Sequence, residues 1–97
     1  MPSYITLFQF TQQGAQSIKE IPNRVEQARA NMQKMGIELK SWHVTMGQYD
    51  VVAVFEAPND EAAAKMSLAI CSQGNARTET SRAFTMDEFK KILGGLP

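Results

Sequence analysis

"VVAVFEA", residues 51–57, is the stretch that decides the fold. A continuous apolar run of this length, bounded by turn residues, is typical of a central strand that is buried on both faces. Gly47–Asp50 leads into the run as a tight connection, and Pro58 stops it. We therefore expect this segment in the middle of a sheet, with a packed layer on each side of it.

Three more strands are predicted at residues 3–10, 37–46 and 75–84. The first is rich in aromatic and β-branched residues, and the last alternates polar side chains, which indicates an edge strand. Regular alternation in the second places Trp42 on the face opposite Leu39. The same alternation places His43 on the face of Leu39.

Helices are predicted between the strands and at the end of the chain. Residues 22–35 repeat apolar side chains every three or four positions and end at Gly36, which suits a left-handed cap. Asn59 is a good N-cap for a second helix. Thr85 and Glu88 form a capping-box pattern before a short C-terminal helix.

The predicted order is β-α-β-β-α-β plus a C-terminal helix, in a single domain spanning residues 1–97. This order is typical of the α+β ferredoxin-like fold, a four-stranded antiparallel sheet with its first and third strands in the centre. Two helices cover only one face of such a sheet, yet both central strands are apolar on both faces. The side chains expected to need a second cover are Tyr4, Phe8, Phe10, Trp42, Val44 and Met46. We expect another copy of the chain to supply it, making at least a homodimer packed through the helix-free sheet face.

Composition excludes several classes of partner. The formal net charge is zero and the pI is about 6.6, so no basic surface for nucleic acid is expected. Cys71 is the only cysteine, which excludes an intrachain disulfide and fits a reducing compartment. Neither a signal peptide nor a membrane span is recognisable, so a cytoplasmic location is expected.

Three residues are candidates for catalysis. Tyr49 and Asp50 either form a turn with an Asp cap and a packed Tyr, or present a hydroxyl and a carboxylate to a polar ligand. His43, the only histidine, is either a structural or interface residue or a general base. No recognisable metal-ligand spacing is present, and His43 is the sole ordinary nitrogen ligand for a haem, so neither metal nor cofactor is expected.

A second set of residues could line one face of the sheet. Two interpretations remain open: a dimer core whose hydroxyls bond their neighbours, or an apolar cleft with a few polar groups, which is usual for a small-molecule pocket. The candidate ligand-binding residues are Tyr4, Thr6, Phe8, Trp42, Tyr49, Thr78 and Thr80.

Four short motifs, taken together, resemble one family. They are Gly47-x-Tyr49-Asp50, Glu56-Ala57-Pro58, Gly74-Asn75-x-Arg77-Thr78 and Arg82-Ala83-Phe84. In this order they resemble the GYD family of small bacterial and archaeal proteins, over almost the whole chain from Tyr4 to about Leu93. The resemblance implies a ferredoxin-like domain of the dimeric α/β-barrel type. It implies no set of catalytic residues.

Three functions are compatible with this pattern. The leading hypothesis is a module that binds or senses a small molecule in a pocket between the sheet and its covering elements. The alternative is a cofactor-free enzyme, similar to a monooxygenase or an isomerase, acting on a small apolar oxygenated substrate. The third is a purely structural assembly subunit, and whether the chain is an enzyme stays open at this point.

Overall fold

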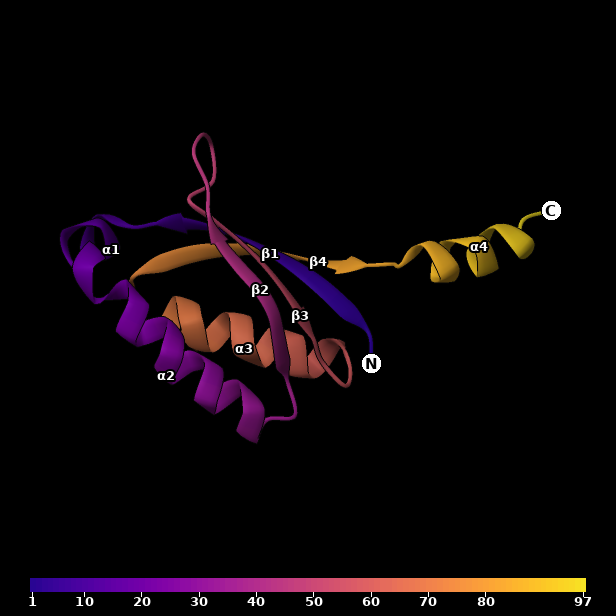
Figure 1. Ribbon diagram of the computed structural model, residues 1–97, viewed down its shortest axis with the longest axis horizontal. Helices are drawn as coiled ribbons and strands as arrows, with labels where there is room; N and C mark the ends of the chain where they lie inside the picture. The colour runs from indigo at the N-terminus through magenta and orange to yellow at the C-terminus, as the bar shows by residue number, and fades with distance from the viewer.

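The computed structural model describes residues 1–97 as one four-stranded sheet with helices (Figure 1). The strands are all antiparallel to their neighbours and lie in the order β2-β3-β1-β4. This confirms the α+β ferredoxin-like prediction, with β1 and β3 in the centre. The elements are β1 (Ser3–Phe10), α1 (Gln12–Gln16), the 3₁₀ turn η1 (Ile18–Glu20), α2 (Ile21–Lys34), β2 (Glu38–Val44), β3 (Val51–Glu56), α3 (Asp60–Ser72), β4 (Ala76–Ala83) and α4 (Met86–Gly94).

The helix ends form where the local sequence predicts them. The Asn59 side chain accepts a hydrogen bond from the backbone N–H of Ala62 at the start of α3, over 2.9 Å. Thr85 and Glu88 form both bonds of the capping box that begins α4. Gly36 has φ of 75°, a left-handed conformation that suits glycine because it has no Cβ.

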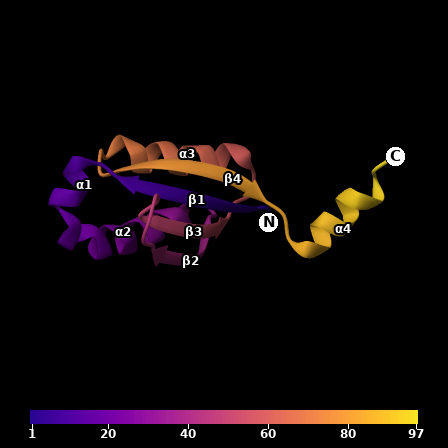
Figure 2. The same ribbon diagram turned by 90° about the horizontal axis from the view of Figure 1, so that it is seen from above.

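Both crossover helices lie on the same face of the sheet. Helix α2 packs beside β2, and α3 packs beside β4, so that the two helices run over opposite sides of the sheet centre (Figure 2). Helix α4 takes no part in this layer. It extends from the end of β4 away from the body in both views, and none of its residues is buried.

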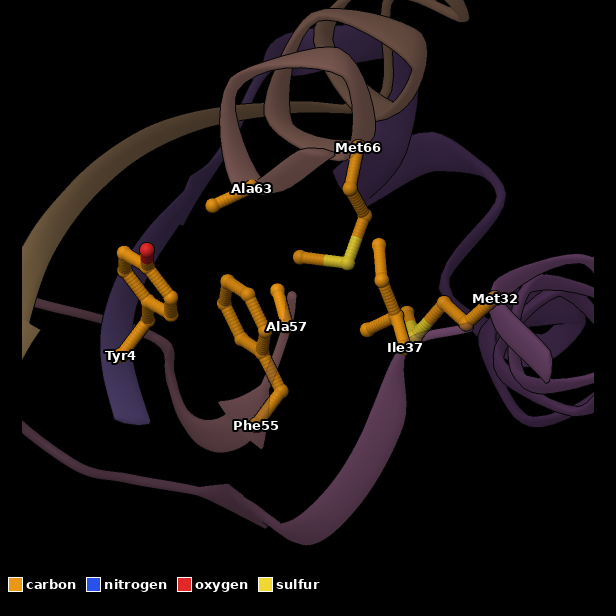
Figure 3. Close-up of a cluster of buried hydrophobic side chains, with 7 residues drawn as sticks. All are labelled: Tyr4, Met32, Ile37, Phe55, Ala57, Ala63 and Met66. Atoms are coloured by element: carbon orange, nitrogen blue, oxygen red, sulfur yellow. The ribbon is translucent and has the colours of Figure 1, made fainter. Parts of the chain in front are cut away.

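The core lies between the helices and the covered face of the sheet (Figure 3). Tyr4 of β1 and Phe55 of β3 stack with their ring centroids 5.2 Å apart. Met66 of α3 reaches the same cluster from above, and Met32 of α2 reaches it from the right in Figure 3. Burying each large apolar side chain stabilises the fold by about 1.5–3 kcal/mol, so this cluster holds both helices against the sheet. The cluster consists of Tyr4, Met32, Ile37, Phe55, Ala57, Ala63 and Met66.

A β-bulge in β2 corrects the predicted alternation of that strand. Leu39 pairs with Phe55 and Ser41 pairs with the adjacent Val54, so Lys40 is an extra residue without its own partner. An extra residue shifts every later side chain to the other face of the sheet. Trp42 therefore lies on the same face as Leu39, and not opposite it as regular alternation predicted.

The same bulge places His43 opposite Val52, on the helix-free face, and not on the face of Leu39 as predicted. The side chain of His43 is exposed there. Regular alternation gave the wrong face because it did not account for the extra residue, Lys40, which moves the later residues of β2 to the opposite face.

The content of the helix-free face also differs from the expectation. The six side chains expected there are elsewhere: Tyr4, Phe8, Phe10, Trp42 and Val44 are on the helix-covered face, and Met46 is in the exposed loop after β2. Both faces of the central strands were apolar in sequence, and the pattern did not say which one meets the helices. The uncovered centre of the sheet is instead aliphatic, formed by Ile5, Leu7, Val52 and Val54.

Candidate functional site

A cavity of about 90 Å³ lies between α2, α3 and the covered face of the sheet. We call it the interhelix cavity. Two small side chains, Ala28 of α2 and Ala53 of β3, are among the residues that line it. Its wall is mostly apolar: Thr6, Phe8, Phe10, Ile21, Arg24, Val25, Ala28, Met32, Leu39, Trp42, Val51, Ala53, Phe55, Met66, Ile70, Gln73, Asn75 and Ala76.

The amphipathic spacing of α2 explains how one helix supplies a whole wall of the interhelix cavity. Ile21, Val25, Ala28 and Met32 recur at intervals of three and four residues, so they share one face of the helix. The opposite wall comes from alternate residues of the strands, which point to one side of the sheet. Trp42 joins that wall only because of the bulge at Lys40.

Asn75 is the unusual polar residue of this wall. It is 7% exposed, and its side-chain Oδ1 accepts a hydrogen bond from Gln13 Nε2 over 3.1 Å. Its backbone carbonyl accepts from the N–H of Thr11, also over 3.1 Å. A Cβ on Gly14 would lie 2.0 Å from that carbonyl oxygen, so only glycine permits this close approach. The other side-chain atom of Asn75, Nδ2, is buried without a partner.

A second hollow, a groove of about 570 Å³, runs between α3 and the edge strand β4. Thr80 is one of its lining residues, and its Oγ1 lies 2.9 Å from both Thr6 Oγ1 and Ser67 Oγ. Thr78 shares a 3.3 Å contact with the Cys71 sulfur. The hydroxyls of Thr6, Ser67 and Thr80 therefore bond one another within the chain.

Tyr4 closes one end of the α3–β4 groove. Its hydroxyl donates a hydrogen bond to Asp60 Oδ1 over 2.5 Å, and the Arg82 guanidinium lies 5.8 Å from its ring centroid. The bond to Asp60 raises the pKa of the Tyr4 phenol above its ordinary value of 10.0, and burial and the Asp60 charge act in the same direction. The hydroxyl proton of Tyr4 is therefore already engaged in a hydrogen bond within the chain.

The Gly47–Asp50 turn is tied to β1. Gly47 has φ of 109°, which favours glycine. The backbone N–H of Asp50 donates to Phe8 O, and the Asp50 carboxylate accepts from Phe10 N–H, both over 2.8 Å. Thr45 Oγ1 donates to the Tyr49 carbonyl over 2.7 Å. The carboxylate thus caps a neighbouring strand and not its own turn.

Tyr49 points its hydroxyl toward β4, where it donates to Glu79 Oε2 over 3.1 Å. This bond raises the pKa of Tyr49 above 10.0, with smaller contributions from desolvation and the Glu79 charge. A shallow hollow on the helix-free side is lined by Tyr49, Glu79 and Arg77 among others. This hollow is separate from the interhelix cavity, whose wall does not include Tyr49.

The structure does not bring the three catalytic candidates together. His43 is on β2 and the Tyr49 hydroxyl is held at β4, which are the opposite edges of the sheet. The Asp50 carboxylate is occupied by Phe10 N–H. Of the ligand-binding candidates, Thr6, Phe8 and Trp42 line the interhelix cavity, and Tyr4, Thr78 and Thr80 line the α3–β4 groove.

Sequence reasoning missed three polar residues of the cavity wall, Arg24, Gln73 and Asn75. The signal for Asn75 was its place directly after the helix-ending Gly74, at the entry to a strand. Nothing in the sequence distinguishes Arg24 from the other charged residues of α2. No three His, Cys, Asp or Glu side chains lie together where they could hold a metal ion. No helix has the length and apolarity that crossing a bilayer requires.

The antiparallel sheet, its two crossover helices and the cavity beneath them define a ferredoxin-like domain with an internal pocket. Residues 4–93 match the family described as GYD domain, and the chain belongs to the GYD family. A relative from Thermus thermophilus, named "Glutamine synthetase and cystathionine beta-lyase binding protein", is 29% identical over 84 residues. The aligned part covers 86% of this chain and 88% of that relative. No solved structure matches the chain.

Proposed function

We propose that this chain works by binding: it holds a small molecule in the interhelix cavity, forms a homodimer, and docks on a protein partner. The makeup of the cavity wall carries the proposal. The wall contains no Asp, Glu, His, Cys, Lys or Tyr, and Arg24 is its one charged residue. Acid–base and nucleophilic catalysis need such groups within reach of a substrate, whereas binding needs apolar surface and a few placed polar atoms.

The homodimer follows from the helix-free face of the sheet. Ile5 is 37% exposed at the centre of this face, and Leu7, Val52 and Val54 are half-buried beside it. A contiguous aliphatic patch on the middle strands is favourable to cover, and a two-fold axis lets the same patch of two copies cover each other. The zero net charge adds little repulsion between the copies.

A protein partner is proposed from the relative and from α4. The relative is named for binding glutamine synthetase and cystathionine beta-lyase. In this chain α4 presents a stripe of exposed apolar residues while its charged residues lie between them, and an amphipathic helix of this kind fits a hydrophobic groove. We propose that α4 docks on an enzyme of that kind. The stripe consists of Met86, Phe89, Ile92 and Leu93.

The experiment that tests the binding function is a fragment screen followed by ¹H–¹⁵N NMR. We expect some small apolar fragments to shift the Trp42 indole and the Asn75 amide signals of the wild-type protein. The matched variant Ala28→Phe fills the cavity from α2, and these shifts should disappear in it. A screen in which no fragment moves these signals, or in which the shifts survive Ala28→Phe, contradicts the proposal.

A further inference from the structure

Three of the four polar residues that line the interhelix cavity lie toward one end of it. β1 ends at Phe10, which pairs with Ala76 at the start of β4, so these two residues mark one end of the sheet. Gln73 and Asn75 come from the connection between α3 and β4 that enters this end. Arg24 is in the first turns of α2, next to Ile21 and Val25 of the same wall. The rest of the wall, toward Leu39 and Phe55, is apolar except for Thr6, whose hydroxyl is bonded to Thr80.

All three of these residues carry hydrogen-bond donors. Nδ2 of Asn75 is buried without a partner, which is costly for an amide unless something accepts its hydrogens. The assignment of Nδ2 and Oδ1 follows from the bond that Oδ1 accepts from Gln13. Arg24 is exposed and forms no ion pair within the chain, and it is the one charged residue among those that line the cavity.

A group that accepts hydrogen bonds and carries a negative charge complements this end. An ionised carboxylate is an acceptor only, and its bonds to charged donors are stronger than those between neutral groups. The apolar part of the ligand is limited by size. A cavity of 150 Å³ holds benzene, so the 90 Å³ available here accepts roughly four non-hydrogen atoms.

We propose that the interhelix cavity takes a small monocarboxylate with a short apolar tail, its carboxylate bonded by Asn75 Nδ2 and attracted by Arg24. This inference rests on the proposed binding function and narrows the class of ligand. It assigns Asn75 and Arg24 as the residues that select an acid over a neutral molecule of the same shape. The tail then lies against Trp42, Ala53 and Val25.

Three probes test separately whether the cavity can be filled and whether it prefers an acid to a neutral molecule. Xenon reports whether the cavity can be filled at all, because it needs no polar partner. Acetate and acetamide each have four non-hydrogen atoms, carry the same methyl tail and differ in the charge of the head. We expect all three to shift the amide signals of the cavity wall, with acetate binding about tenfold more tightly than acetamide.

Two variants test the assigned residues. Asn75→Asp keeps the oxygen that accepts from Gln13 and replaces the donor with an acceptor, so it should weaken acetate binding at least about tenfold and leave xenon binding unchanged. Arg24→Gln, at an exposed position, should weaken acetate binding and leave acetamide binding unchanged. Asn31→Asp introduces the same charge as Asn75→Asp at an exposed position of α2 and is the matched control.

The outcomes divide cleanly. Xenon binding with equal affinities for acetate and acetamide overturns the carboxylate proposal and leaves the binding function standing. Acetate binding that survives both Asn75→Asp and Arg24→Gln also overturns it. Absence of binding by all three probes, xenon included, contradicts the cavity itself and with it the proposed function.

Discussion

The Asp50 carboxylate accepts a hydrogen bond from the backbone N–H of Phe10 over 2.8 Å, which fastens the turn before β3 to the last residue of β1. The backbone N–H of Asp50 completes the link by donating to Phe8 O. The Gly47–Asp50 motif therefore stabilises the sheet in this chain by binding β1. Phe8 and Phe10 both line the interhelix cavity, so the link also fixes one wall of the pocket.

Asp50→Ala should lower the free energy of unfolding by about 1.5–3 kcal/mol, because it removes a charged acceptor and leaves Phe10 N–H without a partner. Urea denaturation followed by Trp42 fluorescence measures the change. Glu26→Ala removes the same charge from an exposed position of α2 and should stay within about 0.5 kcal/mol of wild type. Equal stability of Asp50→Ala and wild type would show that the carboxylate has no structural role.

The start of α4 should respond to acid through Glu88. The backbone N–H of Thr85 and the Arg82 guanidinium both donate to this carboxylate, and they hold the pKa of Glu88 below its ordinary value of 4.5. Because the pKa of Glu88 is lower in the folded state, ionised Glu88 stabilises the fold above pH 4.5. This stabilisation is lost as the pH falls through the folded-state pKa of Glu88. The ¹³C shift of the Glu88 carboxyl, followed against pH, measures this. In Arg82→Gln the midpoint should move back toward 4.5, and a wild-type midpoint at 4.5 would contradict the prediction.

The helix-free face should control the oligomeric state. Val54→Asp places a charge in the middle of the aliphatic patch, and a charge buried at an interface without a partner is costly. We expect wild-type protein to sediment as a dimer at micromolar concentration and Val54→Asp as a monomer. Ala69→Asp, on an exposed position of α3, should remain dimeric. A monomeric wild-type protein would rule out the dimer.

The apolar stripe of α4 should matter for binding and not for folding. Ile92 and Leu93 are 46% and 45% exposed, so replacing both with Asp should change the free energy of unfolding of the domain by no more than about 0.5 kcal/mol per residue. The same double variant should lose binding to the partner enzymes proposed above, measured by sedimentation velocity with each purified enzyme. Lys90→Ala, on the same helix, is the control and should bind normally. Unchanged binding by the double variant would exclude α4 as the docking element.

Most of the fold could be predicted from local patterns. Each of these patterns depends on residues close together in the sequence. They are the apolar run of β3, the helical spacing before Gly36 and the capping box at Thr85. The faces of the sheet could not be assigned in the same way. One extra residue, Lys40, reverses the side of every later residue in β2, and a bulge leaves no mark on composition or periodicity.

The site was harder to predict for a related reason. Thr6 and Phe8 share a face through period-two alternation of β1. Trp42 joins them only through the bulge at Lys40, which alternation does not predict. Arg24 and Asn75 come from different elements and meet only through the tertiary fold. The absence of a partner for Asn75 Nδ2 is a property of the packed structure, so no sequence pattern could have signalled it.

Strand β4 separates the two binding sites proposed for this chain, the interhelix cavity and α4. It begins at Ala76, beside the polar end of the interhelix cavity, and ends at Ala83, where α4 leaves the body. At about 3.3 Å per residue these two ends are roughly 23 Å apart. A small acid at one end and a protein at the other would therefore not compete for space. Any influence of one on the affinity of the other would have to travel along the strand, as a coupling free energy that a thermodynamic cycle of the four liganded states could measure.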